Sequence, residues 1–171
     1  MPKAREMQSE ELNPTLDQHA IMDTLRREHS RSLRQNSPLS LVVAKLDAYP
    51  QICRSYGRVA GNRAVDEFAQ RLMSIVRPYD AIGRYGPEET ILALPGCTLN
   101  AAMNVARRIN AIVSETPISI VHGRFSTTLS MGLAAVDGDE EWRIDSLIGG
   151  ARNALKRAVD SGGNRIEFEE R

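Results

Sequence analysis

The run GPEET, from Gly86 to Thr90, contains the residues best placed to do chemistry. Two adjacent glutamates, Glu88 and Glu89, follow a Gly-Pro turn and precede the apolar run ILALP. Carboxylates at the tip of a hairpin are typical ligands of a divalent metal, because Mg²⁺ prefers carboxylate oxygens. Pro87 is unusual in such a turn, since its ring fixes φ and removes a backbone N–H. The run therefore indicates either a working metal-binding hairpin or one that has lost that role.

Cysteine and histidine offer no second candidate for a metal site. Cys53 and Cys97 lie far apart and form no Cys-x-x-Cys pair, so buried thiols are the better interpretation. His19, His29 and His122 include no pair with the spacing of metal ligands, and we expect them at the surface. Any metal would therefore depend on the hairpin carboxylates.

The elements that position these residues are expected to form one domain. The 171 residues are 42% apolar and 26% charged, as in an ordinary soluble globular protein. No run of 18 apolar residues is present and the N-terminus is polar and acidic, so we expect no membrane span, no signal peptide and a cytoplasmic location. A net charge of zero argues against nucleic acid as a partner. We expect a flexible tail over residues 1–13 and the domain over residues 14–171.

The hydrophobic pattern predicts helices and strands in alternation, with a hairpin in the middle. The expected elements are a helix from Leu16 to about Leu33, a buried strand over Leu39–Leu46, a short helix near Tyr49–Tyr56, a helix over about Gly61–Arg77, a hairpin of AIGRY and TILAL, a helix over Asn100–Ser114, two strands in ISIVHGR and FSTTLSMGLAAV, a helix over about Ile144–Val159, and an edge strand in SGGNRIEFEE. This mixture predicts an α+β fold with a mostly antiparallel sheet covered by helices.

Several fragments resemble the GGDEF domain of bacterial diguanylate cyclases, a family that makes cyclic di-GMP from two GTP molecules. KLDAYPQICRSYGRVAGN, residues 45–62, is similar to the family pattern D-x-D-x-F-K-x-x-N-D-x-x-G-H-x-x-G-D, and Asp47, Gly57 and Gly61 match it. RYGPEET lies over R-x-G-G-D-E-F, and AVDSGGN lies over A-K-x-x-G-R-N. The resemblance covers about residues 12–168 and implies the palm-like fold of nucleotide cyclases.

The metal position of that family differs in this chain. The resemblance implies that Mg²⁺ is held by the first Asp of D-x-D and the first acid of the hairpin, which here are Lys45 and Glu88. A lysine ammonium opposes a divalent cation, so we expect no Mg²⁺ and predict an internal Lys45–Glu88 ion pair. Gly86 and Glu89 remain beside them, while Pro87 replaces a hairpin glycine and fills space next to the nucleotide.

The nucleotide contacts of the family are also replaced. The resemblance implies that guanine is read at the positions of Cys53 and Asn62, where a thiol and an uncharged amide replace Asn and Asp. The lysines that contact phosphate align with Pro50 and Val159. These losses predict a degenerate former active site and no diguanylate cyclase activity.

A second motif of the family is intact. RPYD, Arg77–Asp80, ends five residues before Gly86, which is the spacing of the R-x-x-D site where active cyclases bind their product. An arginine fork can donate to guanine O6 and N7, and a carboxylate can accept from N1–H and N2–H. The family often adds an arginine from the following helix across a dimer contact, and Arg108 matches that position, with Arg107 a weaker candidate.

The motif alone is weak, because composition produces it twice more. RAVD occurs at residues 63–66 and again at residues 157–160. A solvated ion pair at a helix C-terminus is therefore an alternative interpretation of Arg77 and Asp80. Only the position before the hairpin separates RPYD from the two other copies.

The leading hypothesis is a catalytically inactive GGDEF-like receptor for cyclic di-GMP. Arg77, Asp80 and Arg108 would bind the ligand, with no cofactor, and the signal would pass through a protein partner or through a ligand-promoted homodimer. The alternatives are a protein-interaction module that binds no nucleotide, and residual GTP binding or cyclase activity. Neither a nucleic acid nor a membrane is expected as a partner.

Overall fold

Helices and strands alternate through residues 15–138 and 141–169, which the computed structural model describes; the expected tail over residues 1–13 lies outside them. The elements are α1 (Gln18–Gln35), β1 (Leu39–Leu46), α2 (Tyr49–Tyr56), α3 (Arg58–Leu72), β2 (Ala81–Tyr85), β3 (Glu89–Pro95), α4 (Leu99–Glu115), β4 (Ile118–Ile120), β5 (Gly123–Phe125), β6 (Leu129–Val136), α5 (Ile144–Asp160) and β7 (Arg165–Phe168). No helix in these residues is long and apolar enough to cross a membrane.

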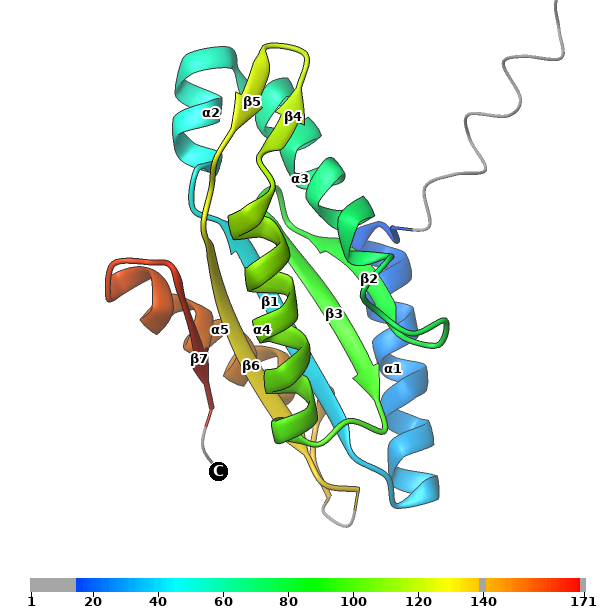
Figure 1. The fold of residues 1–171 in the computed structure, drawn as a ribbon. Coiled ribbons are helices and arrows are strands. Elements are labelled where there is room, and N and C mark those ends of the chain that lie inside the picture. The colour runs from blue at the N-terminus through cyan, green and yellow to red at the C-terminus, as the bar shows by residue number, and fades with distance from the viewer. Residues whose placement is uncertain (1–14, 139–140, 170–171) are drawn as a thin grey trace, which may run out of the picture.

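The main sheet has the strand order β2-β3-β1-β6-β7, and its neighbouring strands are antiparallel except for the parallel pair β6–β7. Helices cover both faces: α2, α3 and α4 lie on one, and α1 and α5 on the other (Figure 1). The central strand β1 is buried on both faces, so its sequence is an apolar run rather than an alternation. Val42 packs in the cluster that contains Phe68 of α3, and Val43 in the cluster that contains Ile21 of α1. The predicted α+β architecture is confirmed.

One predicted strand was wrong. ISIVHGR is not a single strand, because β4 and β5 form a separate two-stranded hairpin around Val121 and His122. Gly123 has a φ of 136°, a backbone conformation that favours glycine, and it lets the chain turn back. The long strand that follows, β6, begins only at Leu129.

The boundaries of α3 also differ from the prediction. The helix begins at Arg58, directly after Gly57, whose φ of 90° separates it from α2. It ends at Leu72, and the chain tightens into shorter-range bonds such as Ile75 N–H to the Leu72 carbonyl at 2.9 Å. Pro78 follows and disfavours a helical conformation in the residue before it. Arg77 therefore lies in a turn rather than in a helix.

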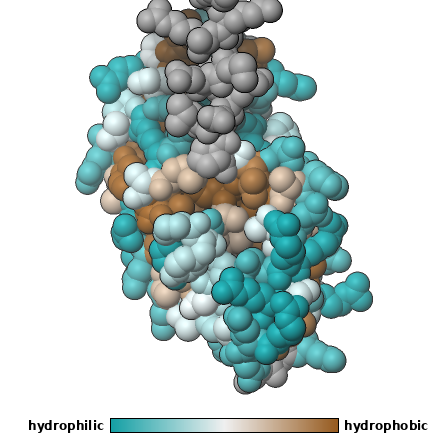
Figure 2. Space-filling model, turned by 90° about the vertical axis from the view of Figure 1, so that its right-hand side faces the viewer, coloured by the Kyte–Doolittle hydropathy of each residue, from teal (hydrophilic) through white to brown (hydrophobic). Residues whose placement is uncertain are grey.

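The edge strand β2 is covered by the chain that leads into α1. Leu16 donates its N–H to the Ile82 carbonyl at 2.9 Å, and its carbonyl accepts from Arg84 N at 2.8 Å. These bonds satisfy backbone groups that a free sheet edge would expose. The side of the molecule that carries α1 and β2 shows a band of apolar side chains between hydrophilic regions (Figure 2).

His29 is not a free surface residue, contrary to expectation. Its Nε2 lies 2.8 Å from the Trp142 carbonyl, and the two rings are 4.2 Å apart between centroids. Because a carbonyl only accepts, Nε2–H donates this bond. Trp142 is buried ahead of α5 and links that helix to α1.

Candidate functional site

The tip of the β2–β3 hairpin lies beside the end of β1. Strand register places Lys45 opposite Glu89 on β3 and opposite Ser130 on β6. The Lys45 Nζ lies 3.0 Å from Glu88 Oε1, with 21% of the lysine side chain and 32% of the glutamate side chain exposed. The predicted ion pair is confirmed. A cation and an anion neutralise each other at the position where the resemblance implies a metal.

The second hairpin carboxylate is paired with α5. Arg152 donates from Nε to Glu89 Oε2 at 2.9 Å and from Nη2 to Glu89 Oε1 at 3.2 Å. This hydrogen bonding raises the pKa of Arg152, and its Cζ lies 5.1 Å from the centre of the Tyr85 ring. Both glutamates therefore already have cationic partners. In residues 15–138 and 141–169, no group of three or more His, Cys, Asp or Glu side chains is arranged to hold a metal ion.

The turn of the hairpin contains Gly86 and Pro87, and Pro87 has no backbone N–H to donate. Gly86 has a φ of 80°, which glycine adopts readily. The Pro87 carbonyl accepts from Arg84 Nη2 at 2.6 Å, and Arg84 Nη1 donates to Asp66 at 2.7 Å. The hairpin is thus fastened to α3 through Arg84.

The space between α2 and α3 is filled by side chains. A Cβ on Gly61 would lie 2.3 Å from Cys53 Sγ and 3.0 Å from the Tyr49 ring. Burial, together with a hydrogen bond to Cys53, raises the pKa of Tyr49. Asn62 is half-buried, and its Oδ1 accepts no hydrogen bond from the described part of the chain. The positions where the resemblance implies guanine recognition are occupied by the Cys53 thiol and the Asn62 amide, and the Tyr49 ring packs beside the thiol.

Asp47 holds three segments together, a role that the sequence did not reveal. Its carboxylate accepts from Thr128 Oγ1 at 2.5 Å, from Ser130 Oγ at 2.6 Å and from Asn164 N at 3.0 Å. Gly163 is needed beside it, because an added Cβ would meet the carboxylate at 3.2 Å. The signal was an aspartate directly after a strand, with Ser130 on the strand that pairs with it and Thr128 just before that strand. Asp47 therefore stabilises the fold.

Arg77 and Asp80 form a tight pair in the turn between α3 and β2. The Asp80 carboxylate, 2% exposed, accepts from Arg77 N at 2.8 Å, from Nη2 at 2.7 Å and from Nε at 3.1 Å. Arg77 Nη2 also donates to the Pro95 carbonyl at 2.9 Å and contacts Cys97 Sγ at 3.1 Å. These bonds raise the pKa of Arg77, while burial raises the pKa of the Cys97 thiol. The guanidinium stays charged and is held from several sides.

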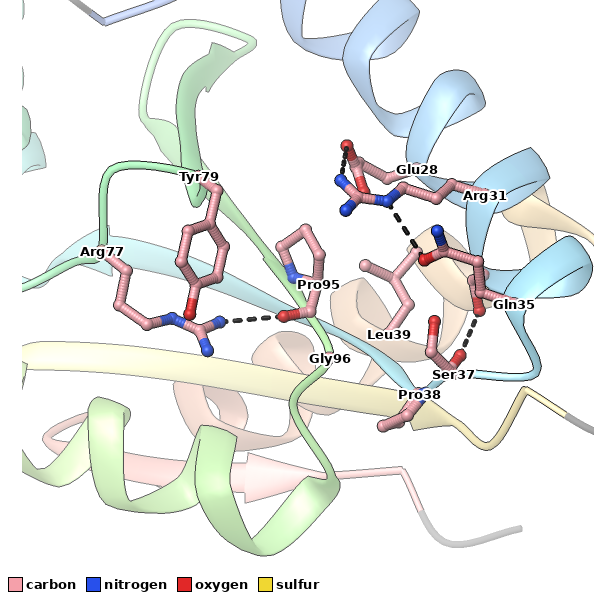
Figure 3. Close-up of a pocket in the computed structure, with 11 residues that line it drawn as sticks. Glu28, Arg31, Gln35, Ser37, Pro38, Leu39, Arg77, Tyr79, Pro95 and Gly96 are labelled. Carbon is pink, nitrogen blue, oxygen red and sulfur yellow. Dashed lines mark hydrogen bonds and ion pairs between the residues drawn. The ribbon is translucent and has the colours of Figure 1, made fainter.

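A cavity of about 320 Å³ opens beside Arg77, between the turn after α3 and the C-terminal half of α1. Figure 3 shows Arg77 and Tyr79 on one wall and Arg31 and Gln35 of α1 on the other, with Pro95 between them. Arg77 is 39% exposed, and its Cζ lies 4.4 Å from the centre of the Tyr79 ring. Tyr79 itself is 59% exposed. A flat cation and an aromatic ring thus border an open cavity, an arrangement suited to a planar ligand.

Comparison with known proteins identifies the family. The family described as "Diguanylate cyclase, GGDEF domain" matches residues 16–165. This chain belongs to the GGDEF family. The domain is 32% identical over 138 residues to the response regulator PleD of Caulobacter vibrioides, a match that covers 80% of this chain and 30% of PleD. The chain thus spans about a third of the length of that relative.

Solved structures agree with the fold. The diguanylate cyclase SiaD of Pseudomonas aeruginosa, solved with its activator SiaC, is 28% identical with a TM-score of 0.80, over 89% of this chain and 58% of SiaD. The GGDEF domain of DgcB from Caulobacter crescentus, solved with c-di-GMP, is 20% identical with a TM-score of 0.80 and covers 92% of both chains. At that identity the second likeness supports the fold alone.

Among the three Arg-x-x-Asp runs of this GGDEF domain, only Arg77–Asp80 forms an arginine–aspartate pair between described residues. Asp66 pairs with Arg84 of β2 instead, and Asp160 pairs with Lys156. The aspartates of the two other copies therefore pair with residues outside their own runs. The tertiary structure distinguishes the run that sequence position had singled out.

The structure does not bring Arg108 together with Arg77. Arg108 is exposed on α4, about 14 Å along the helix from its first residue at 1.5 Å per residue. It is absent from the cavity lining, and its side chain makes no hydrogen bond or ion pair with another described residue. Arg107 donates to Asn104 at 3.2 Å. Sequence reasoning missed Tyr79 and Arg31, because only the fold places them at the same cavity as Arg77.

The aligned phosphate positions carry no charge. Pro50 is exposed at the start of α2, and Val159 is 38% exposed on α5. Val159 lines a cavity of about 350 Å³ with Lys45, Glu89 and Arg152. The cations that line this cavity, Lys45, Arg152 and Lys156, each have an ion-pair partner among the described residues.

Proposed function

We propose that this GGDEF domain is catalytically inactive and acts as a receptor for cyclic di-GMP. The ligand binds at Arg77 and Asp80, and Arg108 completes the site. The signal passes through self-association or a partner protein. Two observations distinguish the lost catalytic activity from the proposed ligand binding. Lys45 and Glu88 neutralise each other where a metal would lie, whereas the Arg77 guanidinium borders an open cavity.

The observation that carries the binding proposal is that one Arg-x-x-Asp run pairs internally at a cavity while the other two do not. Arg77 Nη1 has no partner among the described residues, and the Arg77 side chain is more than a third exposed. This leaves donors for the O6 and N7 atoms of guanine. Asp80 is 2% exposed behind Arg77, and it takes part in binding by holding the Arg77 side chain beside the cavity.

The position of Arg108 supports the part of the proposal that concerns dimers. Because Arg108 lies well along α4 and does not line the cavity, a second copy of the chain would supply it. Cyclic di-GMP has two guanine bases and two phosphates, so it offers contacts to more than one protomer. We therefore expect the ligand to promote a homodimer.

Isothermal titration calorimetry with cyclic di-GMP tests the proposal. The wild-type protein should bind at micromolar ligand, and the Arg77→Ala, Asp80→Ala double variant should lose at least 100-fold in affinity. Arg63→Ala is the matched control, because Arg63 belongs to an Arg-x-x-Asp run that does not pair with its aspartate. Absence of binding by the wild type, or equal binding by the double variant, ends the proposal.

A second candidate function is a protein-interaction module that binds no nucleotide. Exposed apolar side chains favour it: Tyr56 is 42%, Val59 70% and Val121 83% exposed. Tyr56 stacks on His122 with 4.8 Å between ring centroids, which joins α2 to the β4–β5 hairpin. The three side chains come from α2, the start of α3 and the β4–β5 turn, and apolar side chains that gather in one exposed patch mark contact surfaces.

Affinity purification from cells separates the two functions. If the module hypothesis holds, Val59→Asp, Val121→Asp loses the partners that the wild type retains, and Arg77→Ala keeps them. If partners instead depend on Arg77 and on cyclic di-GMP, the receptor proposal is supported.

A further inference from the structure

We infer that Tyr79 is a base-stacking residue of the Arg77 site. One purine base of the ligand would lie flat against the phenol ring while Arg77 reads its edge. This inference rests on the proposed function and adds to it a residue that sets affinity. It also assigns separate tasks to neighbouring side chains: stacking to Tyr79 and base selection to Arg77.

Packing does not explain the position of Tyr79. Its side chain is 59% exposed in the turn before β2, and no hydrogen bond between described residues involves its hydroxyl. The ring faces the cavity beside Arg77 (Figure 3). The Arg77 guanidinium lies over the ring, with its Cζ 4.4 Å from the ring centre. An aromatic ring displayed in this way is available as a platform for a flat ligand.

Arg77 is held in place before any ligand arrives. Asp80 binds Nε and Nη2, and the Pro95 carbonyl and Cys97 Sγ also contact Nη2. The guanidinium carbon lies over the Tyr79 ring, 4.4 Å from its centre, so the two groups have a defined position relative to each other. Little side-chain entropy is lost when a base stacks on groups that are already ordered.

The cavity matches a single base in size and lining. Its volume of about 320 Å³ lies at the lower end of the range for ligand pockets. It suits one nucleobase with its phosphate rather than a whole cyclic dinucleotide. Ser37 and Gln35 supply polar atoms on the wall opposite Tyr79, and Gly96 adds a lining position without a side chain.

Stacking and edge recognition predict different specificities. Every purine has a π-face, so stacking on tyrosine tolerates a change of base. Hydrogen bonds to O6 and N7 favour guanine. Loss of Tyr79 should therefore weaken cyclic di-GMP and cyclic di-AMP by a similar factor, whereas Arg77→Lys should reduce the preference for cyclic di-GMP.

The experiment combines binding isotherms with a probe on the ring. We expect Tyr79→Ala to bind cyclic di-GMP about 10- to 100-fold more weakly than wild type, and Tyr79→Phe to bind within about threefold. The protein labelled with 3-fluorotyrosine reports the ring directly, with the Tyr79→Phe variant assigning its ¹⁹F signal. Addition of cyclic di-GMP to the full wild-type chain should shift that signal.

Each outcome decides one question. Binding by the wild type with a shifted Tyr79 signal and weak binding by Tyr79→Ala supports the inference. Binding by the wild type with an unmoved signal, or with Tyr79→Ala within threefold, overturns the stacking role and leaves the receptor proposal intact. Absence of wild-type binding at about 100 μM cyclic di-GMP overturns the receptor proposal and the stacking role with it.

Discussion

The hairpin edge and the turn before β2 each contain an internal ion pair, but the two pairs leave different surfaces. At the hairpin, Lys45 and Glu88 meet through single atoms at 3.0 Å and both remain partly exposed. In the turn, the Asp80 carboxylate is 2% exposed behind an Arg77 side chain that is 39% exposed. The first pair presents balanced charge, while the second presents a guanidinium to a cavity. Burial of one partner decides whether an ion pair merely stabilises the fold or also offers a binding surface.

The largest effect is expected from removal of the buried partner. Asp80→Ala leaves the Arg77 N–H and guanidinium without their acceptor, so we expect the free energy of unfolding to fall by about 2 kcal/mol. The melting temperature should drop by about 4–8 °C, and cyclic di-GMP affinity should fall at least 100-fold. Thermal melts and calorimetry measure both. An Asp80→Ala protein with wild-type stability would contradict the positioning role of this carboxylate.

The next largest effect is expected from removal of Arg108, which a second copy of the chain would supply. Arg108→Ala should weaken cyclic di-GMP binding about tenfold and abolish ligand-promoted dimers, because the proposal takes this arginine from a second chain. Analytical ultracentrifugation with and without ligand measures the dimer. Arg107→Ala is the control, since Arg107 is the neighbouring exposed residue and bonds within its own helix. Equal dimerisation by Arg108→Ala and wild type would remove Arg108 from the site.

A smaller effect is expected at the hairpin. Lys45→Ala leaves Glu88 without its cation, and we expect a loss of about 1 kcal/mol, or about 2–4 °C in melting temperature. Lys156→Ala is the control, because this lysine lines the same cavity but is 74% exposed. Cyclic di-GMP affinity should not change in either variant. An unchanged melting temperature for Lys45→Ala would mean that the ion pair contributes no stability.

The smallest expected effect is at the former catalytic site, where restoring two residues should produce no cyclase activity. Lys45→Asp, Pro87→Gly restores the first acid of the family's D-x-D pattern and the glycine of its hairpin, yet Cys53 and Asn62 still lack the guanine contacts. Incubation of this variant with GTP and Mg²⁺, followed by chromatography, should show no cyclic di-GMP. Product formation would show that the nucleotide contacts were not limiting and would break the contrast between the two regions.

The sequence predicted what depends on local pattern and on fixed spacing. The apolar run of β1 predicted a central strand, and the hairpin brought Glu88 to Lys45 as expected. These contacts follow because paired strands place their residues at a regular register. The position of the hairpin beside β1 could therefore be predicted from the sequence.

What the sequence could not predict depends on distant segments that meet only in the fold. The burial of Asp80 follows from its contacts with Arg77, which is also held by Pro95 and Cys97 at the far end of β3. Tyr79 and Arg31 share a cavity although 48 positions separate them in the chain. The pairing of Asp66 with Arg84 likewise required α3 to lie against β2. A motif alone shows which residues are close in sequence, but it does not show which residues they contact in the fold.

A thermal-shift measurement with three nucleotides tests the central contrast most directly. Cyclic di-GMP should raise the melting temperature, with about 2.7 kcal/mol of stabilisation at a ligand concentration of 100 Kd. GTP with Mg²⁺ should leave it unchanged, cyclic di-AMP should act only weakly, and Arg77→Ala should abolish the response to cyclic di-GMP. Stabilisation by GTP with Mg²⁺, or no response to cyclic di-GMP, would contradict the account.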